Sequence, residues 1–182
     1  KDVADVDFGI VGPDGYDAML QNSREFAELG IPFIFDPGQA MPLFNGEELR
    51  TMIEQATYVT VNDYESSLLQ ERTGLSEKDI AERVSAYIIT RGPRGSEVHS
   101  KSGMMTVPAA DAIRVVDPTG CGDAYRAGLI FGLMNGHDMA TSGRIASLMG
   151  ALKIEHLGPQ NQRFDYARFA EQFRQQFGYA LK

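Results

Sequence analysis

The stretch VVDPTGCGDAYRAG, residues 115–128, combines closely spaced glycines with a carboxylate at the start of an apolar run. Gly120, Cys121 and Gly122 stand where a helix is predicted to begin, so their backbone N–H groups have no acceptor inside it and can point to one spot. The helix dipole adds partial positive charge there, which favours an anion. The stretch therefore predicts an anion site with the carboxylate of Asp123 beside it.

An anion site next to a carboxylate suits the transfer of a phosphoryl group to a hydroxyl group. The amides would hold the transferred charge while Asp123 accepts the hydroxyl proton. In the alternative reading, Asp123 only caps the helix and the glycines only turn the chain, and the spacing alone leaves both readings open. The helix start would lower the pKa of the Cys121 thiol, but no histidine is paired with this cysteine, so we do not predict a nucleophilic role for it.

Three more loops carry Gly, Asp or Asn after a predicted strand, namely residues 36–38, 62–65 and 90–95. Ligands of parallel α/β sheets bind beyond the carboxyl ends of the strands. We also expect the loop 117–123 to follow a strand. The four loops are therefore predicted to form one site.

Asn62 and Glu65 are three residues apart at a predicted helix start, on one face of the helix. Their oxygens suit the water shell of a hydrated Mg²⁺ ion, although taken alone the pair is better explained as a helix N-cap. Residues 90–95 (TRGPRG) would wrap a nucleotide phosphate or ribose with backbone groups, or would form only a tight turn between strands.

Strand and helix patterns alternate along the chain, which predicts an α/β fold with a mostly parallel sheet flanked by helices. A small antiparallel hairpin is expected near residues 96–107. The predicted strands cover residues 6–11, 32–35, 58–61, 86–90, 96–100 and 104–107, and the predicted helices cover 16–29, 47–55, a segment after 62, 76–84, 121–135, 139–156 and 165–177.

The composition indicates one soluble domain and limits its partners. The 182 residues are 43% hydrophobic and 23% charged, with a net charge of −8 and no cluster of Lys and Arg, so neither nucleic acid nor a membrane surface is an expected partner. No apolar run approaches the roughly 20 residues of a membrane span. The N-terminal KDVADVDFGIVG does not fit a signal peptide, and the single cysteine agrees with a cytoplasmic location. The three histidines show no metal-ligand spacing.

Two familiar phosphate motifs are missing from the sequence. It contains no GxxxxGK[ST], which excludes a P-loop. The glycines of GCGDAYRAG do not fit GxGxxG, which disfavours a Rossmann oxidoreductase.

The loops taken together resemble the ribokinase-like, or PfkB, family of carbohydrate and nucleoside kinases, and most of all its bacterial adenosine-kinase-like sugar kinases. The last motif is the specific one, D-x-T-G-A-G-D-x-F, with Cys121 in place of Ala and Tyr125 in place of Phe. The motifs that carry the resemblance are Asn62-x-x-Glu65, Thr90-x-Gly92-x-x-Gly95 and Asp117-Pro-Thr-Gly-Cys-Gly-Asp123-Ala-Tyr-x-Ala-Gly128.

The resemblance implies a ribokinase-like, three-layer fold that is incomplete here. Residues 1–182 would form a single nucleotide-binding and catalytic domain, the C-terminal part of a larger kinase whose lid and N-terminal portion are absent. The implied activity is ATP-dependent transfer of the γ-phosphoryl group to a primary hydroxyl of a sugar or nucleoside such as ribose or adenosine. The alternative is a nucleotide-binding module without catalysis, or an inactive kinase fragment. A homodimer of the full-length enzyme is compatible with the resemblance.

The resemblance also implies residue roles. Asp123 would be the base, with the anion-hole amides of Gly120, Cys121 and Gly122, while Asn62 and Glu65 would organise Mg²⁺ and the phosphates. The nucleotide would be lined by Thr90, Arg91, Gly92, Pro93, Arg94 and Gly95, with Ser147 near the adenine.

A monovalent cation such as K⁺ is implied beside the anion hole. One half of its site would be the loop of Asp117 and Thr119. The other half would use the backbone carbonyls of Lys153, His156 and Gly158, so that the side chain of Lys153 need not contact the ion.

Overall fold

The computed structural model describes residues 6–181, so residues 1–5 and 182, which the single-domain prediction includes, lie outside the described part. The chain divides into two compact units, each with its own hydrophobic core. The first unit takes in the described chain up to Arg91 together with residues 97–105, and the second takes in residues 92–96 and the chain from Thr106 onward. The single domain over residues 1–182 stays a prediction.

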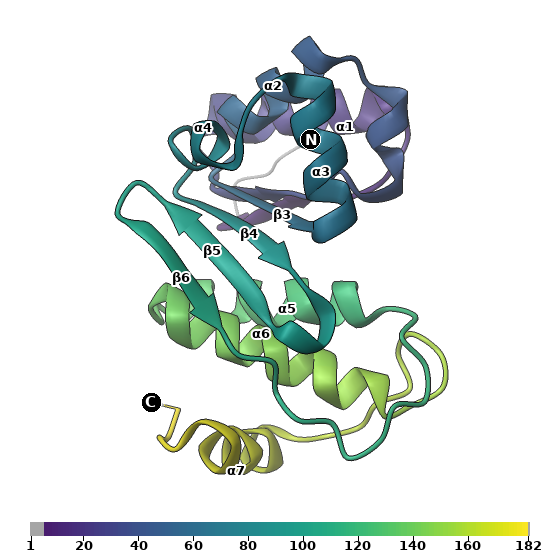
Figure 1. Cartoon of the computed structure of the whole chain (residues 1–182), viewed down its shortest axis with the longest axis vertical. Coiled ribbons are helices and arrows are strands. Elements are labelled where there is room, and N and C mark those ends of the chain that lie inside the picture. Colours follow the sequence, from purple (N-terminus) through teal and green to yellow (C-terminus); the bar gives the residue numbers. More distant parts are fainter. Residues whose placement is uncertain (1–5, 182) are drawn as a thin grey trace. The chain divides into compact units, whose positions relative to one another are not determined.

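The sheet has six strands whose spatial order follows the sequence (Figure 1). The first four strands run parallel, and the last two form the expected antiparallel hairpin. The register sets Asn62 beside Thr90, so the predicted loops 62–65 and 90–95 leave neighbouring strands at the same edge. The strands are β1 (Gly9–Val11), β2 (Phe33–Phe35), β3 (Tyr58–Asn62), β4 (Ala86–Thr90), β5 (Ser96–Ser100) and β6 (Gly103–Val107).

Four helices of the first unit cover one face of the sheet (Figure 1). They are α1 (Tyr16–Leu29), α2 (Gly46–Gln55), α3 (Asp63–Thr73) and α4 (Glu77–Ala81). Because side chains alternate along a strand, every second residue of the parallel strands faces these helices. The buried strand residues of this core are Val11, Phe33, Phe35, Val59, Val61, Tyr87 and Ile89.

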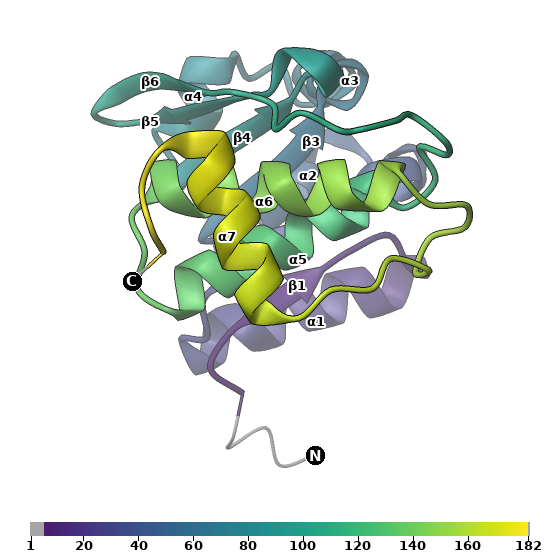
Figure 2. The ribbon, with the colours of Figure 1, turned by 90° about the horizontal axis from the view of Figure 1, so that it is seen from below.

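The second unit is helical and consists mainly of α5 (Cys121–Met134), α6 (Met139–Ile154) and α7 (Tyr166–Phe177). A Cβ atom on Gly128 would lie 2.7 Å from the Cα of Ala146, so glycine lets α5 and α6 approach closely. α7 crosses α6 (Figure 2) and buries Phe169 and Phe173 against it. None of the helices in residues 6–181 combines the length and apolar character that a membrane crossing requires.

The predicted α/β fold with a mostly parallel sheet, flanking helices and a late hairpin is confirmed. Some bounds were wrong: the strand predicted at residues 6–11 begins at Gly9, and the helix predicted to about residue 84 ends at Ala81. Two 3₁₀ helices were not predicted: η1 (Gly38–Leu43) begins at the last residue of the predicted loop 36–38, and η2 (Gly92–Arg94) lies within the predicted loop 90–95.

The expectation that loop 117–123 follows a strand was also wrong. Residues 108–120 contain no helix or strand. Val116 and Asp117 donate backbone hydrogen bonds to one carbonyl, that of Ile154, and two bonds to a single acceptor at a helix end do not make a strand ladder.

Candidate functional site

The turn that begins α5 depends on glycine at position 120. Gly120 is the N-cap residue, with φ 80° and ψ 5°, in the left-handed region. A Cβ atom there would also lie 2.9 Å from the Cβ of Pro159. Both observations explain why the sequence has glycine at this bend. The first N–H groups of α5 follow the bend and have no acceptor inside the helix.

Cys121 does not offer its amide as predicted, because its N–H donates to the carbonyl of Pro118 at 3.1 Å. Within residues 6–181, the N–H groups of Gly120, Gly122 and Asp123 have no protein acceptor. The candidate anion site therefore keeps two of the three predicted amides and gains that of Asp123.

The side chain of Asp123 is exposed and makes no hydrogen bond or ion pair within the part of the chain that the structure describes. It lies in the first turn of α5, where the helix dipole favours a negative charge. The alternative reading, a hydrogen-bonded helix cap, does not apply, because Gly120 is the N-cap and no side chain caps this helix. An unpaired carboxylate beside free amides can accept a proton from a bound hydroxyl group.

The Cys121 thiol differs from the expectation based on the helix start. Burial raises its pKa, and the opposing effect of the positive charge of Lys153 is smaller. The predicted lowering of the pKa was therefore wrong, since partial burial has the largest effect on this thiol. A thiol with a raised pKa is a poor nucleophile, in line with the absence of a predicted nucleophilic role.

Asp117 holds together two parts of the second unit. Its Oδ1 accepts from the N–H of Thr119 at 2.9 Å and its Oδ2 from the N–H of Gly158 at 2.8 Å. The bonds from Thr119, and then that from Gly158, lower the pKa of Asp117 to about 2. Asp117 is therefore ionised at neutral pH and fully used in hydrogen bonds, which makes it a structural carboxylate and not a base.

Lys153 is completely buried, and its Nζ donates to the carbonyl oxygens of Asp117 at 2.7 Å and His156 at 3.1 Å. The five residues predicted for the cation, Asp117, Thr119, Lys153, His156 and Gly158, thus lie together. The side chain of Lys153 was not expected to contact the ion, yet it contacts two of the backbone segments predicted to bind it.

Asn62 and Glu65 form a capping box at the start of α3. Asn62 Oδ1 accepts from the N–H of Glu65, and Glu65 Oε2 accepts from the N–H of Asn62, both at 2.8 Å. The helix-cap reading is therefore correct. The other carboxylate oxygen of Glu65 accepts no hydrogen bond within the described residues, and these residues contain no group of three or more His, Cys, Asp or Glu suited to a metal ion.

The predicted nucleotide loop begins in the first unit with Thr90 and Arg91 and continues in the second with residues 92–95. Arg91 is paired with Glu97 at 2.7 Å. Gly95 has φ 83°, and a Cβ on it would lie 2.1 Å from the carbonyl oxygen of Val107, so only glycine fits. These residues therefore form the predicted turn, with backbone geometry that other residues would disturb.

Ser147 has a structural use that its spacing does not predict. Its Oγ accepts from the N–H of Ala110 at 2.7 Å and donates to the carbonyl of Pro108 at 3.0 Å. These bonds tie α6 to the segment before the signature, and the proximity of Ser147 to an adenine stays a prediction.

Two residues of α5 make contacts that the sequence did not predict. The hydroxyl of Tyr125, which the family signature lacks, bonds to the buried Oγ of Ser96 at 2.7 Å, and burial raises the pKa of Tyr125 to about 12. Arg126 lies over Gly122, because a Cβ on that glycine would be 2.5 Å from Arg126 Nη1. A basic residue four positions after a glycine on a helix is the signal that would have found this neighbour.

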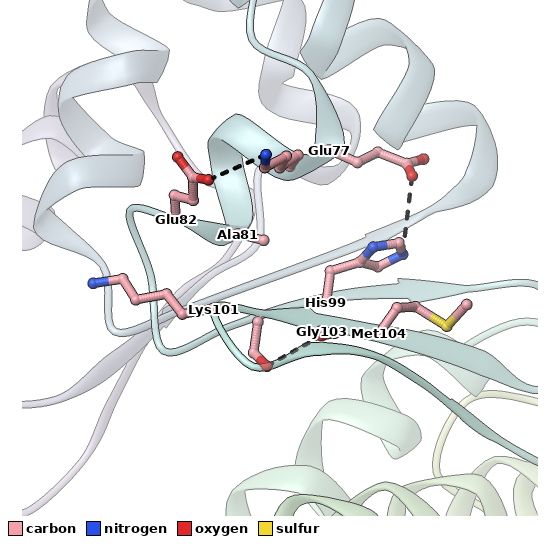
Figure 3. Close-up of a pocket in the computed structure, with 9 residues that line it drawn as sticks. Glu77, Ala81, Glu82, His99, Lys101, Gly103 and Met104 are labelled. Carbon is pink, nitrogen blue, oxygen red and sulfur yellow. Dashed lines mark hydrogen bonds and ion pairs between the residues drawn. The ribbon is translucent and has the colours of Figure 1, made fainter.

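A separate hollow of about 710 Å³ lies in the first unit between α4 and the β5–β6 hairpin (Figure 3). His99 lies within it, 3.3 Å from Glu97 and 3.9 Å from Glu77. None of the predicted site residues lines this hollow, so it is not part of the candidate site.

Comparisons with known proteins show which family the chain is similar to. The sequence model of the pfkB family carbohydrate kinases matches residues 13–164. A nucleoside kinase of Methanocaldococcus jannaschii is 34% identical over 126 residues, which cover 69% of this chain and 42% of that protein. A ribokinase of Bacillus subtilis is 31% identical over 130 residues, or 71% of this chain and 42% of that protein.

Solved structures are similar over nearly the whole chain. A nucleoside kinase of Burkholderia thailandensis in complex with ADP-inosine is 52% identical, with a TM-score of 0.97, and the match covers 100% of this chain and 57% of that one. The chain spans about half the length of the curated relatives it matches. On the match to residues 13–164, the chain belongs to the pfkB family of carbohydrate kinases.

Proposed function

We propose that the complete protein containing this chain transfers the γ-phosphoryl group of ATP to a primary hydroxyl of a nucleoside or sugar. The observation that carries the proposal is the start of α5, where an exposed, unpaired Asp123 carboxylate stands beside N–H groups without acceptors. The similarity to a nucleoside kinase solved with inosine and with ADP-inosine supports a nucleoside as acceptor.

In the proposed reaction the acceptor oxygen forms a bond to the γ-phosphorus while the bond from this phosphorus to the bridging oxygen of ADP breaks. Asp123 accepts the proton of the acceptor hydroxyl as its oxygen attacks. The N–H groups of Gly120, Gly122 and Asp123 hold the negative oxygens of the phosphoryl group, assisted by the dipole of α5.

Arg126 is proposed as an additional donor to the same group. Its guanidinium lies over Gly122 on the first turns of α5. A planar guanidinium can donate to two phosphate oxygens at once and carries a full positive charge. The backbone amides of a helix turn are neutral donors.

Asn62 and Glu65 are proposed to face the nucleotide phosphates through water. Each uses one oxygen in the capping box, which leaves Glu65 a second oxygen for a water molecule of a hydrated ion. Mg²⁺, when bound, neutralises phosphate charge and keeps most of its water shell. The donor set fits such water-mediated contact better than direct coordination, since no cluster of ligating side chains occurs in residues 6–181.

The nucleotide is proposed to contact Thr90, Arg91, Gly92, Pro93, Arg94 and Gly95, with Ser147 near the adenine. A cytoplasmic location and a homodimer of the complete enzyme also stay predictions.

The proposal is tested by ADP formation from ATP and Mg²⁺ with the complete gene product and a panel of inosine, adenosine, ribose and fructose. We expect ADP formation that depends on the acceptor, with the nucleosides preferred. ATP binding without ADP formation on any acceptor would instead support a nucleotide-binding module without catalysis.

A further inference from the structure

Lys153 is a fully buried lysine that the proposed phosphoryl transfer does not use. It stands in the last turn of α6, and its side chain has no exposed surface. Lysine is almost never completely buried unless its ammonium group is paired, because removing the charge from water is costly. The partners of its ammonium group therefore indicate what the site is built to hold.

The surroundings of the Lys153 ammonium group are oxygen atoms. Its Nζ donates to the carbonyls of Asp117 at 2.7 Å and His156 at 3.1 Å. The carboxylate of Asp117 is close enough for the charge of Lys153 to contribute to its lowered pKa. The negative end of the α6 dipole adds to this field. One positive charge is thus held by carbonyl oxygens, a carboxylate and a helix C-terminus.

The same backbone segments are those that the family resemblance implies for a monovalent cation. A cation bound by these carbonyls would need the oxygens of Asp117 and His156 that Lys153 already uses. A second positive charge so near the first, away from water, is also disfavoured by repulsion. The described residues therefore do not fit an additional ion at these two carbonyls.

We propose that the ammonium group of Lys153 takes the place of a monovalent cation, so that phosphoryl transfer by this protein does not depend on K⁺. Lys153 is then a positioning residue, since its ammonium group donates to the backbone carbonyls of Asp117 and His156. It holds Asp117 in place. The carboxylate of Asp117 in turn binds the backbone N–H of Thr119, next to Gly120, and the backbone N–H of Gly158 in the loop after α6.

The inference rests on the proposed kinase function, and its test separates the two. The complete gene product is assayed for nucleoside-dependent ADP formation and for thermal unfolding in KCl, NaCl and choline chloride at equal ionic strength. We expect the rates to agree within about twofold and the Tm to be the same in all three salts. A rate or a Tm that rises selectively with K⁺ in the wild-type protein would overturn the inference.

Two variants test whether the positive charge of Lys153 is needed for turnover and stability. Lys153→Met keeps most of the length of the side chain without its charge. We expect kcat to fall about 100-fold, because the catalytic turn is displaced, with a smaller change in the KM for ATP. Lys153→Ala leaves space beside the same carbonyls, so K⁺ or NH₄⁺, but not Na⁺ or choline, is expected to raise both its rate and its Tm. The control is Lys78→Met on the exposed face of α4, which should behave as the wild type.

A purely structural role for Lys153 predicts no difference between K⁺ and choline in Lys153→Ala, and that result would overturn the inference. If neither variant folds, the wild-type comparison still decides it. Absence of nucleoside-dependent ADP formation in every salt contradicts the kinase proposal alone, because the Tm values of the wild type and of Lys153→Ala then still decide the role of Lys153.

Discussion

The carboxylate of Asp117 accepts a hydrogen bond of 2.8 Å from the backbone N–H of Gly158, 41 residues further along the chain. This bond joins the beginning of the glycine signature to the loop after α6. The same carboxylate closes the turn at Thr119. The signature therefore contains two acids with different uses, one that holds the turn and one, Asp123, that stays free.

The role of Asp117 predicts how stability changes with pH. Its pKa falls from the ordinary aspartate value of 3.8 to about 2 in the folded protein, so its contribution to stability is present above about pH 4 and is lost as the pH falls toward 2. Asp117→Asn should be less stable than the wild type at pH 7, and the difference in Tm should shrink between pH 4 and pH 2. Thermal unfolding measured across this pH range checks the prediction, and a constant difference would contradict it.

The two glycines that flank Cys121 should respond differently to alanine. Gly120→Ala forces a left-handed residue against Pro159, and we expect a loss of about 1–3 kcal/mol in the free energy of unfolding. Gly122 has no positive φ, and its nearest neighbour is the flexible end of Arg126. Gly122→Ala should therefore keep its stability but displace Arg126 and lower kcat. Urea unfolding and steady-state kinetics distinguish the pair, and equal losses of stability would contradict this assignment.

Arg126 should matter for turnover more than for folding. With its guanidinium at the candidate anion site, Arg126→Lys keeps a charge but loses the planar pair of donors. We expect a kcat at least about tenfold lower, with a small change in Tm, whereas the exposed Arg168→Lys on α7 should match the wild type. Wild-type kinetics for Arg126→Lys would remove Arg126 from the site.

Tyr125→Phe restores the residue of the family signature, yet it should destabilise this protein. The change leaves the buried Oγ of Ser96 without its partner, at a cost of about 1–3 kcal/mol. The double variant Ser96→Ala, Tyr125→Phe should recover part of this loss, since both polar groups are then gone. Urea unfolding of Tyr125→Phe, Ser96→Ala and the double variant checks this prediction. A double variant whose loss of stability equals the sum of the two single losses would contradict it.

Local patterns in the sequence predicted where helices begin and where strands lie, because neighbouring residues determine these features. The capping residue Asn62 marks a helix start because its side chain bonds to the backbone three residues on. The helix of the signature begins at Cys121 as expected, since Gly120 supplies the required bend. The strands were found because their apolar runs are bounded by turn residues.

Several hydrogen-bond partners, both distant and local, escaped prediction. The ammonium group of Lys153 reaches a carbonyl 36 residues away, and spacing gives no indication of where a long side chain ends. The amide of Cys121 was expected to be free, but the turn closes on Pro118 and uses it. The free state of Asp123 also required the structure, because a capping acid and an unpaired acid have the same position in the sequence.

The most direct test of the central proposal compares Asp123→Asn with the wild type in the complete gene product. The matched control is Asp17→Asn, another acid in the first turn of a helix, α1. We expect kcat for nucleoside-dependent ADP formation to fall by about 10²–10⁴-fold in Asp123→Asn, with ATP affinity and Tm nearly unchanged, and no change in the control. Turnover by Asp123→Asn within a few-fold of the wild-type rate would contradict the assignment of Asp123 as the base.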